Sequence, residues 1–273
     1  MEEGLGNLGL ALAGAVSRDV TEQLAASRLL VLAPHPDDET LACGGCIARV
    51  AGSGGSLTLA VATDGASGRH DIPGPELVRI RRAELTAAVS ELGTDPGRVV
   101  WMGFDDGQLE SEVDRLAERV GELVASVRPT VVLSPWAHDT HPDHAALGRA
   151  ARKATAGSDS ALLEYVVWAW TDPLHLLRDH ARHRWSEAGQ GRRGPRWSMP
   201  GRPVRVRTGG YRGAKVSALG AYRSQLGPSA SELGLPSGEG PLGPTFLQHF
   251  TGPFELFIPV AAGRPTPGRP ASA

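Results

Sequence analysis

The chain has 273 residues and a formal net charge of −2, with a sequence pI near 6.5. This length suits one large domain with a substantial core, or a domain with an appendage. Because the charge is nearly balanced and no run of about 18 apolar residues occurs, the sequence favours neither a nucleic-acid-binding surface nor a membrane span.

The start of the chain and its cysteines bear on the cellular compartment. The first residues, Met1-Glu2-Glu3, carry two acidic side chains where a secretory signal would be basic. Cys43 and Cys46 are too few for a disulfide framework. We therefore expect a soluble, cytoplasmic protein.

In chain order, residues 5–27 come first, and their roughly helical apolar spacing predicts a helical extension over residues 1–27. Apolar β-like runs then alternate with helix-like segments. The β-like runs lie at 29–34, 57–63, 98–102, 130–134 and 162–168, and the helix-like segments at 40–52, 76–92, 110–127 and 143–156. This alternation predicts a Rossmann-like α/β fold, with a mainly parallel sheet in the order 3-2-1-4-5 flanked by helices.

We expect a single domain over residues 28–261, with loop and strand additions near its C-terminal end. The additions are an Arg-, Gly- and Pro-rich exposed insertion or two-stranded excursion at 186–213, a helix at 215–226, a long loop at 227–243, a late strand at 254–258 and a disordered tail at 262–273.

The most informative stretch runs from Pro34 to Glu39 and reads Pro-His-Pro-Asp-Asp-Glu, directly after the first apolar run. So many ionisable groups in one turn cost stability unless a cation compensates them, and a divalent metal is the usual one. Taken alone, the turn also fits a helix N-cap with a satisfied histidine. Glu39 either supports the turn from behind or caps the helix.

A second cluster, His138 to His144, follows the fourth β-like run. Taken alone, it also fits an ordinary capped helix start. In an open α/β sheet, ligands bind beyond the carboxyl ends of the strands, where the strand order reverses. In the order 3-2-1-4-5 the first and fourth strands are neighbours at that point, so we expect the two clusters to meet there.

The residue types in the two clusters point to metal chemistry. Two imidazoles and one carboxylate, with positions left for water, match a catalytic zinc site or a related divalent-metal site. Alternation along the first turn favours His35 and Asp38 as ligands and leaves Asp37 facing water. His141 and His144 lie three positions apart at a helix start, so one can bind metal while the other acts on substrate.

The two clusters resemble the signature of the PIG-L/LmbE-like zinc-dependent N-acetylglucosaminyl deacetylase superfamily. Its hallmarks are a His-Pro-Asp-Asp-Glu turn after the first strand and a His-Pro-Asp-His turn after the fourth, and both are present. The resemblance covers roughly residues 28–260. Lesser similarities are Thr63-Asp64-Gly65, Arg81-Arg82-Ala83-Glu84-Leu85, Trp101 to Gly107 and Tyr222-Arg223-Ser224-Gln225.

The resemblance implies a role for individual residues. Asp37 would be the general base, and His141 would stabilise the tetrahedral intermediate or protonate the leaving amine. Arg81 and Asp106 match positions that contact sugar hydroxyls in relatives. The implied ligands of Zn²⁺, or of another divalent metal such as Fe²⁺, are His35, Asp38 and His144.

The resemblance also implies a reaction, which is removal of the N-acetyl group from an N-acetylglucosamine-type sugar. The expected partner is a small-molecule N-acyl amino-sugar glycoconjugate, and we favour a secondary metabolite such as a glycosylated antibiotic. The alternatives are a mycothiol-type thiol-sugar deacetylase or conjugate amidase, and a non-catalytic metal-containing sugar-binding protein. Asp37 and His141 argue against the last, because binding alone needs no base.

Other features allow more than one interpretation. Cys43-Gly44-Gly45-Cys46 has a redox-like spacing, but it falls inside a predicted helix, and we favour close helix–sheet packing. Gly52 to Gly55 precedes the second strand and is therefore no dinucleotide fingerprint. Trp168, Trp170 and Trp185 line an acyl or aglycone site or fill the core, and we favour the core. The remaining histidines are expected to be surface or structural, namely His70, His175, His180, His183 and His249.

Overall fold

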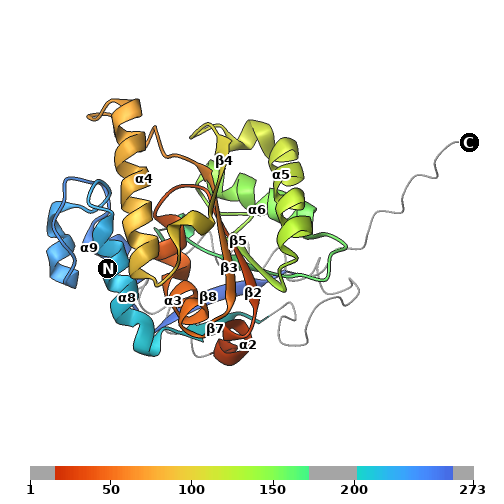
Figure 1. Ribbon diagram of the computed structural model, residues 1–273. Coiled ribbons are helices and arrows are strands. Elements are labelled where there is room, and N and C mark those ends of the chain that lie inside the picture. Colours follow the sequence, from red (N-terminus) through yellow and green to blue (C-terminus); the bar gives the residue numbers. More distant parts are fainter. Residues whose placement is uncertain (1–15, 172–201, 261–273) are drawn as a thin grey trace, which may run out of the picture.

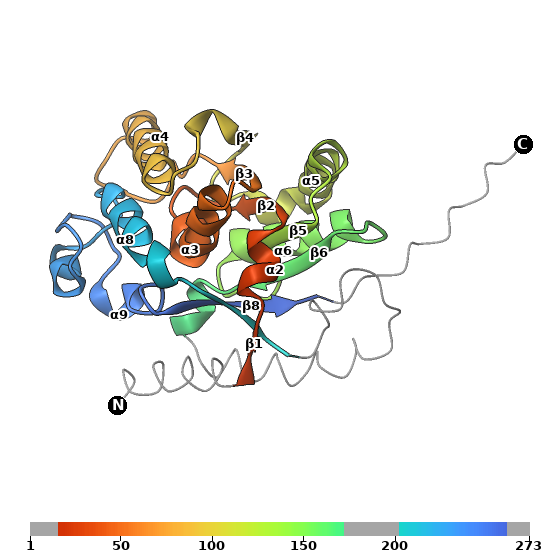
Figure 2. The ribbon, with the colours of Figure 1, turned by 60° about the horizontal axis from the view of Figure 1, so that its bottom comes forward.

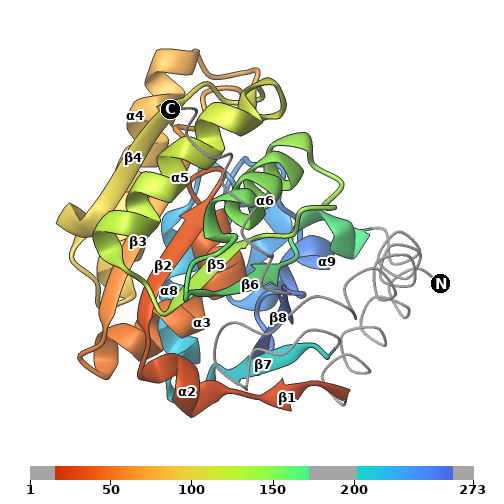
Figure 3. The same ribbon diagram turned by 90° about the vertical axis from the view of Figure 1, so that its right-hand side faces the viewer.

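The computed structural model describes residues 16–171 and 202–260. Among these residues, eight strands form one sheet. They are β1 (Arg18–Asp19), β2 (Arg28–Ala33), β3 (Ser56–Thr63), β4 (Val99–Phe104), β5 (Val131–Pro135), β6 (Ala161–Tyr165), β7 (Val204–Arg207) and β8 (Phe254–Pro259). Their order across the sheet is β1-β7-β8-β6-β5-β2-β3-β4, as Figure 3 shows from one side.

The strands expected from the alternating pattern form the parallel part of the sheet. They are β2 to β6, and their order β4-β3-β2-β5-β6 is the predicted 3-2-1-4-5. Every residue of β5 is buried, and so is every residue of β2 after Arg28. Continuous apolar runs, rather than alternating ones, are typical of parallel strands covered on both faces.

Three strands extend the sheet beyond β6. β8 is the predicted late strand and pairs antiparallel with both β6 and β7, while β1 pairs parallel with β7. Residues 186–213 were predicted as an exposed insertion or a two-stranded excursion, and residues 202–213 are described. There β7 is a strand, but it belongs to the main sheet, and Val204 and Val206 are fully buried, which corrects the prediction of exposure. In β7 valine alternates with arginine, which is the two-residue pattern of a strand with one buried face. The Arg, Gly and Pro residues around β7 hid this pattern in the sequence.

The N-terminal prediction also needs correction. Residues 16–27 are not one helix, because the strand β1 is followed by the short helix α2 (Thr21–Ala25), which Figure 2 brings to the front. Residues 18–19 pair with β7 instead of continuing a helix, because the backbone hydrogen bonds of the sheet are favoured here over those of a helix. The predictions for residues 1–15, 186–201 and 262–273 lie outside the described residues. Residues 227–243, predicted as a long loop, include the 3-10 helix η6 (Pro228–Leu233) and an isolated β-bridge at Leu242.

Helices cover both faces of the sheet (Figures 1 and 2). Helices α3 (Asp38–Gly52), α4 (Gly74–Glu91) and α8 (Arg212–Ala221) lie on one face, and α5 (Val113–Val127) and α6 (Pro142–Thr155) lie on the other. The buried apolar residues accordingly form one large cluster on each face. The shorter helical segments are η1 (Pro96–Arg98), η2 (Leu109–Glu112), η3 (Trp168–Thr171), η5 (Gly209–Tyr211), η6 (Pro228–Leu233) and α9 (Pro244–Leu247).

The Cys-Gly-Gly-Cys stretch lies in the middle of α3, as the packing interpretation requires. Cys43 and Cys46 are both free thiols and fully buried. A Cβ on Gly45 would lie 2.6 Å from Cγ2 of Thr208, so only glycine allows this approach. No helix in the described ranges combines the length and apolar character needed to cross a bilayer.

Candidate functional site

The fold brings the two charged clusters together. The first lies in the turn between β2 and α3, and the second between β5 and α6. β2 and β5 are parallel neighbours, so their carboxyl ends lie at the same edge of the sheet. α3 and α6 both begin at this edge, and helix N-termini favour negative charge and bound anions.

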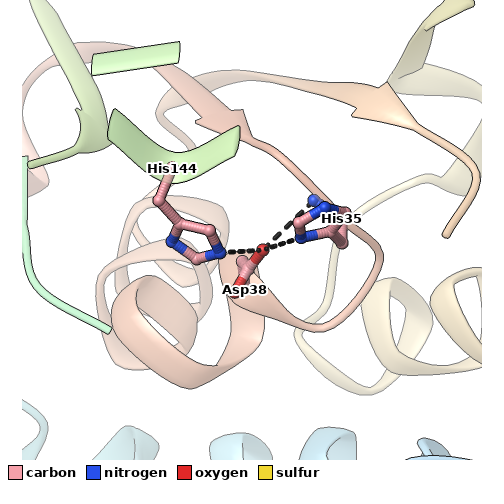
Figure 4. A group of neighbouring side chains, drawn as sticks. All are labelled: His35, Asp38 and His144. Atoms are coloured by element: carbon pink, nitrogen blue, oxygen red, sulfur yellow. Dashed lines mark hydrogen bonds and ion pairs between the residues drawn. The ribbon is translucent and has the colours of Figure 1, made fainter. Parts of the chain in front are cut away.

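His35, Asp38 and His144 form a compact buried group (Figure 4). Oδ2 of Asp38 lies 3.3 Å from Nδ1 of His35 and 3.3 Å from Nε2 of His144. The same oxygen accepts a hydrogen bond of 3.1 Å from the backbone N–H of His35. One potential ligand atom from each residue lies within 4.8 Å of the others, as the sequence predicted.

His144 carries the sharpest indication of a missing partner in this group. Its side chain is fully buried, yet within the described part of the chain neither ring nitrogen has a hydrogen-bond partner. Buried polar atoms without partners are rare in native proteins and call for an explanation such as an ion. A divalent cation between the three side chains would satisfy the imidazole, and the set of two histidines and one aspartate is typical of catalytic zinc.

Two carboxylates lie against the other ring nitrogen of His35. Nε2 is 3.0 Å from Oδ1 of Asp106 and 3.1 Å from Oδ2 of Asp143. Asp143 is fully buried and also accepts the backbone N–H groups of Gly107 at 2.8 Å and Leu109 at 3.1 Å. Histidines that bind metal commonly donate their second ring N–H to a carboxylate in this way.

Asp143 was given no role by the sequence analysis, although it belongs to the His-Pro-Asp-His turn. Its position between the candidate residues His141 and His144 could have indicated a role at the site. Its partners come from the segment after β4, and that proximity depends on the tertiary fold. His35, His141 and Asp143 form a second group whose potential ligand atoms lie within the same 4.8 Å.

The ionisation of the cluster follows from its geometry. Burial favours the neutral form of Asp38, but His144 and His35 outweigh it and hold the pKa of Asp38 well below its usual range. Burial likewise opposes the charged form of His35, yet hydrogen bonds to Asp106, Asp143 and Asp38 raise its pKa well above the usual value. The side chains therefore stabilise one another as ions, and a bound cation would take the place of the ring proton.

Asp37 has an unusual backbone conformation next to this group. Its φ is +126°, a value that residues with a side chain rarely adopt. Its N–H donates to Oε2 of Glu39 at 3.0 Å, and its Oδ2 lies 3.2 Å from Nη2 of Arg81. Burial raises the pKa of Asp37 well above its usual range, although Arg81 acts in the opposite direction.

The two predicted sugar-contacting residues have partners inside the protein. Arg81 is 3% exposed, and besides Asp37 its guanidinium donates to the carbonyl of Pro36. Asp106 contacts His35 and accepts the backbone N–H of Ser67 at 2.7 Å. A sugar contact by either residue stays a prediction, and the observed contacts hold the turn that carries Asp37 and His35.

His141 lies beside the metal-ligand candidates as the N-cap of α6, and its Nδ1 accepts the backbone N–H of Asp143 at 3.2 Å. Its ring centroid is 5.0 Å from that of His144 and 5.2 Å from that of His35. Burial lowers the pKa of His141 to about 4, and repulsion from both neighbouring imidazoles adds to this effect. The ring is therefore neutral near pH 7, and because Nδ1 is an acceptor its proton lies on Nε2.

An aromatic wall continues from His141. The ring of Trp168 stacks on His141 at a centroid distance of 6.0 Å, and Phe246 packs 4.9 Å from Trp168. The carboxylate of Asp139 fixes this arrangement, because it accepts the backbone N–H groups of both His141 and Trp168. Trp168 is partly buried and packs against the large apolar cluster, as the favoured core interpretation expects, and its ring also lies beside His141.

The structure describes some of the other tryptophan and histidine residues that the predictions covered. Trp170 stacks on His249 at 5.9 Å, away from the metal-ligand candidates, and His70 is exposed, as predicted. The remaining residues of these predictions lie outside the described ranges, namely His175, His180, His183 and Trp185.

Comparisons with known proteins agree with this geometry. Residues 30–155, which hold both clusters, match the PIG-L family, described as GlcNAc-PI de-N-acetylase. The probable N-acetyl-alpha-D-glucosaminyl L-malate deacetylase 2 of Bacillus cereus is 36% identical over 140 residues, which are 47% of this chain and 60% of that protein. The chain thus spans less than two thirds of that relative.

Two further proteins match over more of the chain. The 1D-myo-inositol 2-acetamido-2-deoxy-alpha-D-glucopyranoside deacetylase of Kineococcus radiotolerans is 28% identical over 250 residues, covering 73% of this chain and 69% of that protein. Among solved structures, the deacetylase of the A40926 pseudoaglycone has a TM-score of 0.60 at 21% identity and covers 88% of this chain and 100% of that one. At this identity the second likeness shows the fold alone.

Proposed function

We propose that this chain, whose residues 30–155 match the PIG-L family, is a metal-dependent hydrolase that removes the N-acetyl group from an N-acetylglucosamine-type sugar on a larger molecule. The observation that carries the proposal is the fully buried imidazole of His144, which makes no hydrogen bond within the described part of the chain and pairs with the carboxylate of Asp38 at 3.3 Å. Such a group suits a metal site, and Asp37 and His141 favour catalysis over metal-dependent sugar binding, because binding alone needs no base.

The proposed metal ligands are His35, Asp38 and His144, and the proposed ion is Zn²⁺, with Fe²⁺ as the alternative. The donor set of two imidazoles and one carboxylate suits either ion. When bound, a divalent ion there would polarise the amide carbonyl and lower the pKa of a coordinated water to roughly 7.

Asp37 is the proposed general base. It directly precedes Asp38, so its carboxylate borders the space where an attacking water would lie. Arg81 contacts Oδ2, and the second oxygen, Oδ1, can take the proton of that water. The same carboxyl group can later return the proton to the leaving amine.

His141 is proposed to act from the opposite side of the reacting amide. Its Nδ1 is occupied by the backbone of Asp143, so its Nε2–H is the donor that can reach a substrate. A hydrogen bond from this group stabilises the negative charge that develops on the amide oxygen as water attacks. The carbon–nitrogen bond then breaks and releases acetate and a free amino sugar.

We propose a secondary-metabolite glycoconjugate, such as a glycosylated antibiotic, as the substrate. The aromatic pair Trp168 and Phe246 supports this choice, because it places an apolar wall beside His141 that suits an apolar group attached to the sugar. The second candidate is an N-acetylglucosaminyl inositol of the mycothiol type. It is favoured by the similarity to the Kineococcus radiotolerans protein over 250 residues.

The experiment compares three N-acetylglucosaminyl compounds, carrying inositol, malate or a glycopeptide aglycone. Zinc-loaded and iron-loaded protein are incubated with each compound, and acetate release and loss of the acetyl mass are measured, with a chelator-treated sample as control. We expect metal-dependent turnover that is fastest for the glycopeptide. Faster turnover of the inositol compound would select the second candidate, and binding without turnover of any compound would refute the deacetylase.

A further inference from the structure

We infer that Tyr222 is a positioning residue for Asp37 and that it acts through the buried carboxylate of Glu39. The inference deepens the proposed function, because it takes Asp37 to be the general base. Tyr222 lies at the C-terminal end of α8, beyond the segment 30–155 that matches the family model but within the Tyr-Arg-Ser-Gln stretch that resembles the superfamily. A residue from the C-terminal part of the chain would therefore help to hold the turn that carries Asp37.

The need for positioning arises from the backbone of Asp37. Asp37 and Arg128 are the non-glycine residues with a positive φ among those described. Arg128, at φ +49°, adopts the left-handed helical conformation at the end of α5, where such values are common. Asp37, at φ +126°, lies outside that region, and a strained conformation persists only when its surroundings hold it.

Glu39 provides the contact that holds this conformation. Oε2 of Glu39 accepts the N–H of Asp37 at 3.0 Å. Glu39 is fully buried, so its carboxylate cannot exchange this bond for one to water. The direction in which the Asp37 side chain points thus depends on where the Glu39 carboxylate is fixed.

Two hydroxyl groups fix that carboxylate. Oε1 of Glu39 accepts hydrogen bonds from Oγ1 of Thr40 and from the hydroxyl of Tyr222. Thr40 is the next residue in the chain and moves with Glu39, whereas Tyr222 comes 183 positions later and is anchored independently. Tyr222 is therefore the contact that ties the carboxylate to the rest of the fold.

A purely structural role is the competing explanation, because the ring of Tyr222 is 1% exposed and packs in the large apolar cluster. The substitution Tyr222→Phe keeps the ring and removes only the hydroxyl. Tyr165 offers a matched control. It is also 1% exposed, and its hydroxyl donates to the carbonyl of Leu32 at 2.7 Å, with no hydrogen bond to Glu39 or Asp37 given among the described residues.

The first measurement compares kcat, KM, metal content and melting temperature of the full-length, metal-loaded variants. For Y222F we expect kcat to fall roughly ten- to hundredfold, as for a displaced catalytic group, with KM and bound metal unchanged. Y165F should lose similar thermal stability yet keep its kcat. Wild-type kcat in Y222F, or equal loss of kcat in both variants, would overturn the inference.

The second measurement is a double-mutant cycle with Asp37→Asn. If Tyr222 acts through Asp37, adding Y222F to D37N should lower the residual kcat no further, because the residue it positions is already inactive. A second fall of the same size as in the wild-type background would show that Tyr222 acts independently of Asp37, and the inference would be wrong.

The third measurement separates this inference from the proposed function. Amide hydrogen exchange at Asp37, followed by ¹⁵N NMR on the metal-loaded protein, should be roughly tenfold faster in Y222F and unchanged in Y165F. Unchanged exchange in Y222F would refute the positioning role even in an active enzyme. Faster exchange in a protein that turns over no N-acetyl sugar would instead refute only the deacetylase function.

Discussion

Nε2 of His144 lies 3.3 Å from Oδ2 of Asp38, although the two residues belong to the first turns of different helices. This contact exists because β2 and β5, which lead into those helices, are adjacent parallel strands. It joins the two charged clusters into one buried group in which the imidazole has no hydrogen-bond partner among the described residues. The predictions below depend on that group and on the packing around it.

His144→Ala should abolish stoichiometric metal binding, because it removes one of three proposed ligands. We expect metal content near zero by inductively coupled plasma mass spectrometry, and no rise of the melting temperature when zinc is added. Wild-type protein should show a rise, since a ligand that binds only the folded state stabilises it. His70→Ala, at an exposed histidine, is the control and should behave as wild type. Undiminished metal content in H144A would exclude this ligand set.

Asp37→Asn should keep the metal and lose most of the activity. The amide has nearly the shape of the carboxylate but cannot take a proton, and loss of an acid–base group typically costs roughly two to four orders of magnitude in rate. The measurements are kcat and metal content of the same preparation. Asp159→Asn, at an exposed site, should leave both unchanged. Turnover near the wild-type rate would show that Asp37 is not the base.

Asp106→Ala tests whether this residue contacts sugar or supports His35. Because Oδ1 of Asp106 lies 3.0 Å from Nε2 of His35, we expect the metal affinity to fall roughly ten- to hundredfold, as for other carboxylates behind metal-bound histidines. Chelator competition gives the affinity, and steady-state kinetics with saturating metal give KM. A higher KM with unchanged metal affinity would favour the sugar contact instead.

The two thiols should be inert in the folded protein. Burial raises the pKa of Cys43 and of Cys46 well above their usual range, and the nearby Glu255 carboxylate acts in the same direction. The reactive thiolate is therefore absent near neutral pH. Reaction with a disulfide reagent should be very slow in buffer and rapid for both thiols in denaturant. Fast labelling of the native protein would reopen the redox interpretation.

Glu255→Gln should strongly destabilise the fold. Oε1 of Glu255 lies 2.7 Å from Nζ of Lys215, and both side chains are almost fully buried. The substitution leaves the ammonium group without a countercharge, and breaking a buried pair in this way costs roughly 3–5 kcal/mol. Urea denaturation measures the loss. Asp114→Asn breaks the exposed pair with Lys153 and should leave the midpoint nearly unchanged.

Much of the fold could be predicted because its central strands are continuous apolar runs. Burial on both faces makes these runs conspicuous, and the helices between them dictate parallel crossovers. The edge of the sheet was harder to predict. β7 has four residues and β1 has two, so their pairing partners, rather than any local pattern, decide that they are strands.

Some contacts in the candidate site could likewise be predicted from the sequence, and others could not. His35, Asp38 and His144 could be predicted as neighbours, because each lies in a turn or helix start that follows a central strand. Asp143 belongs to the same turn as His144, so its approach to His35 could have been predicted as well. The contact between Glu39 and Tyr222 could not, because it joins side chains from segments with no local relationship. The positive φ of Asp37 is also invisible in sequence, since such a conformation persists only where the surrounding structure holds it.

The sequence by itself thus determined the order of the central strands and the types of ligand brought to one edge of the sheet. Apolar periodicity and turn composition are local properties, and they specify these features without knowledge of distant contacts. Only the tertiary structure decided which groups each imidazole nitrogen contacts, which carboxylates lie beside the rings, and how Asp37 is held. Those properties depend on distances of a few ångströms between segments that only packing brings together.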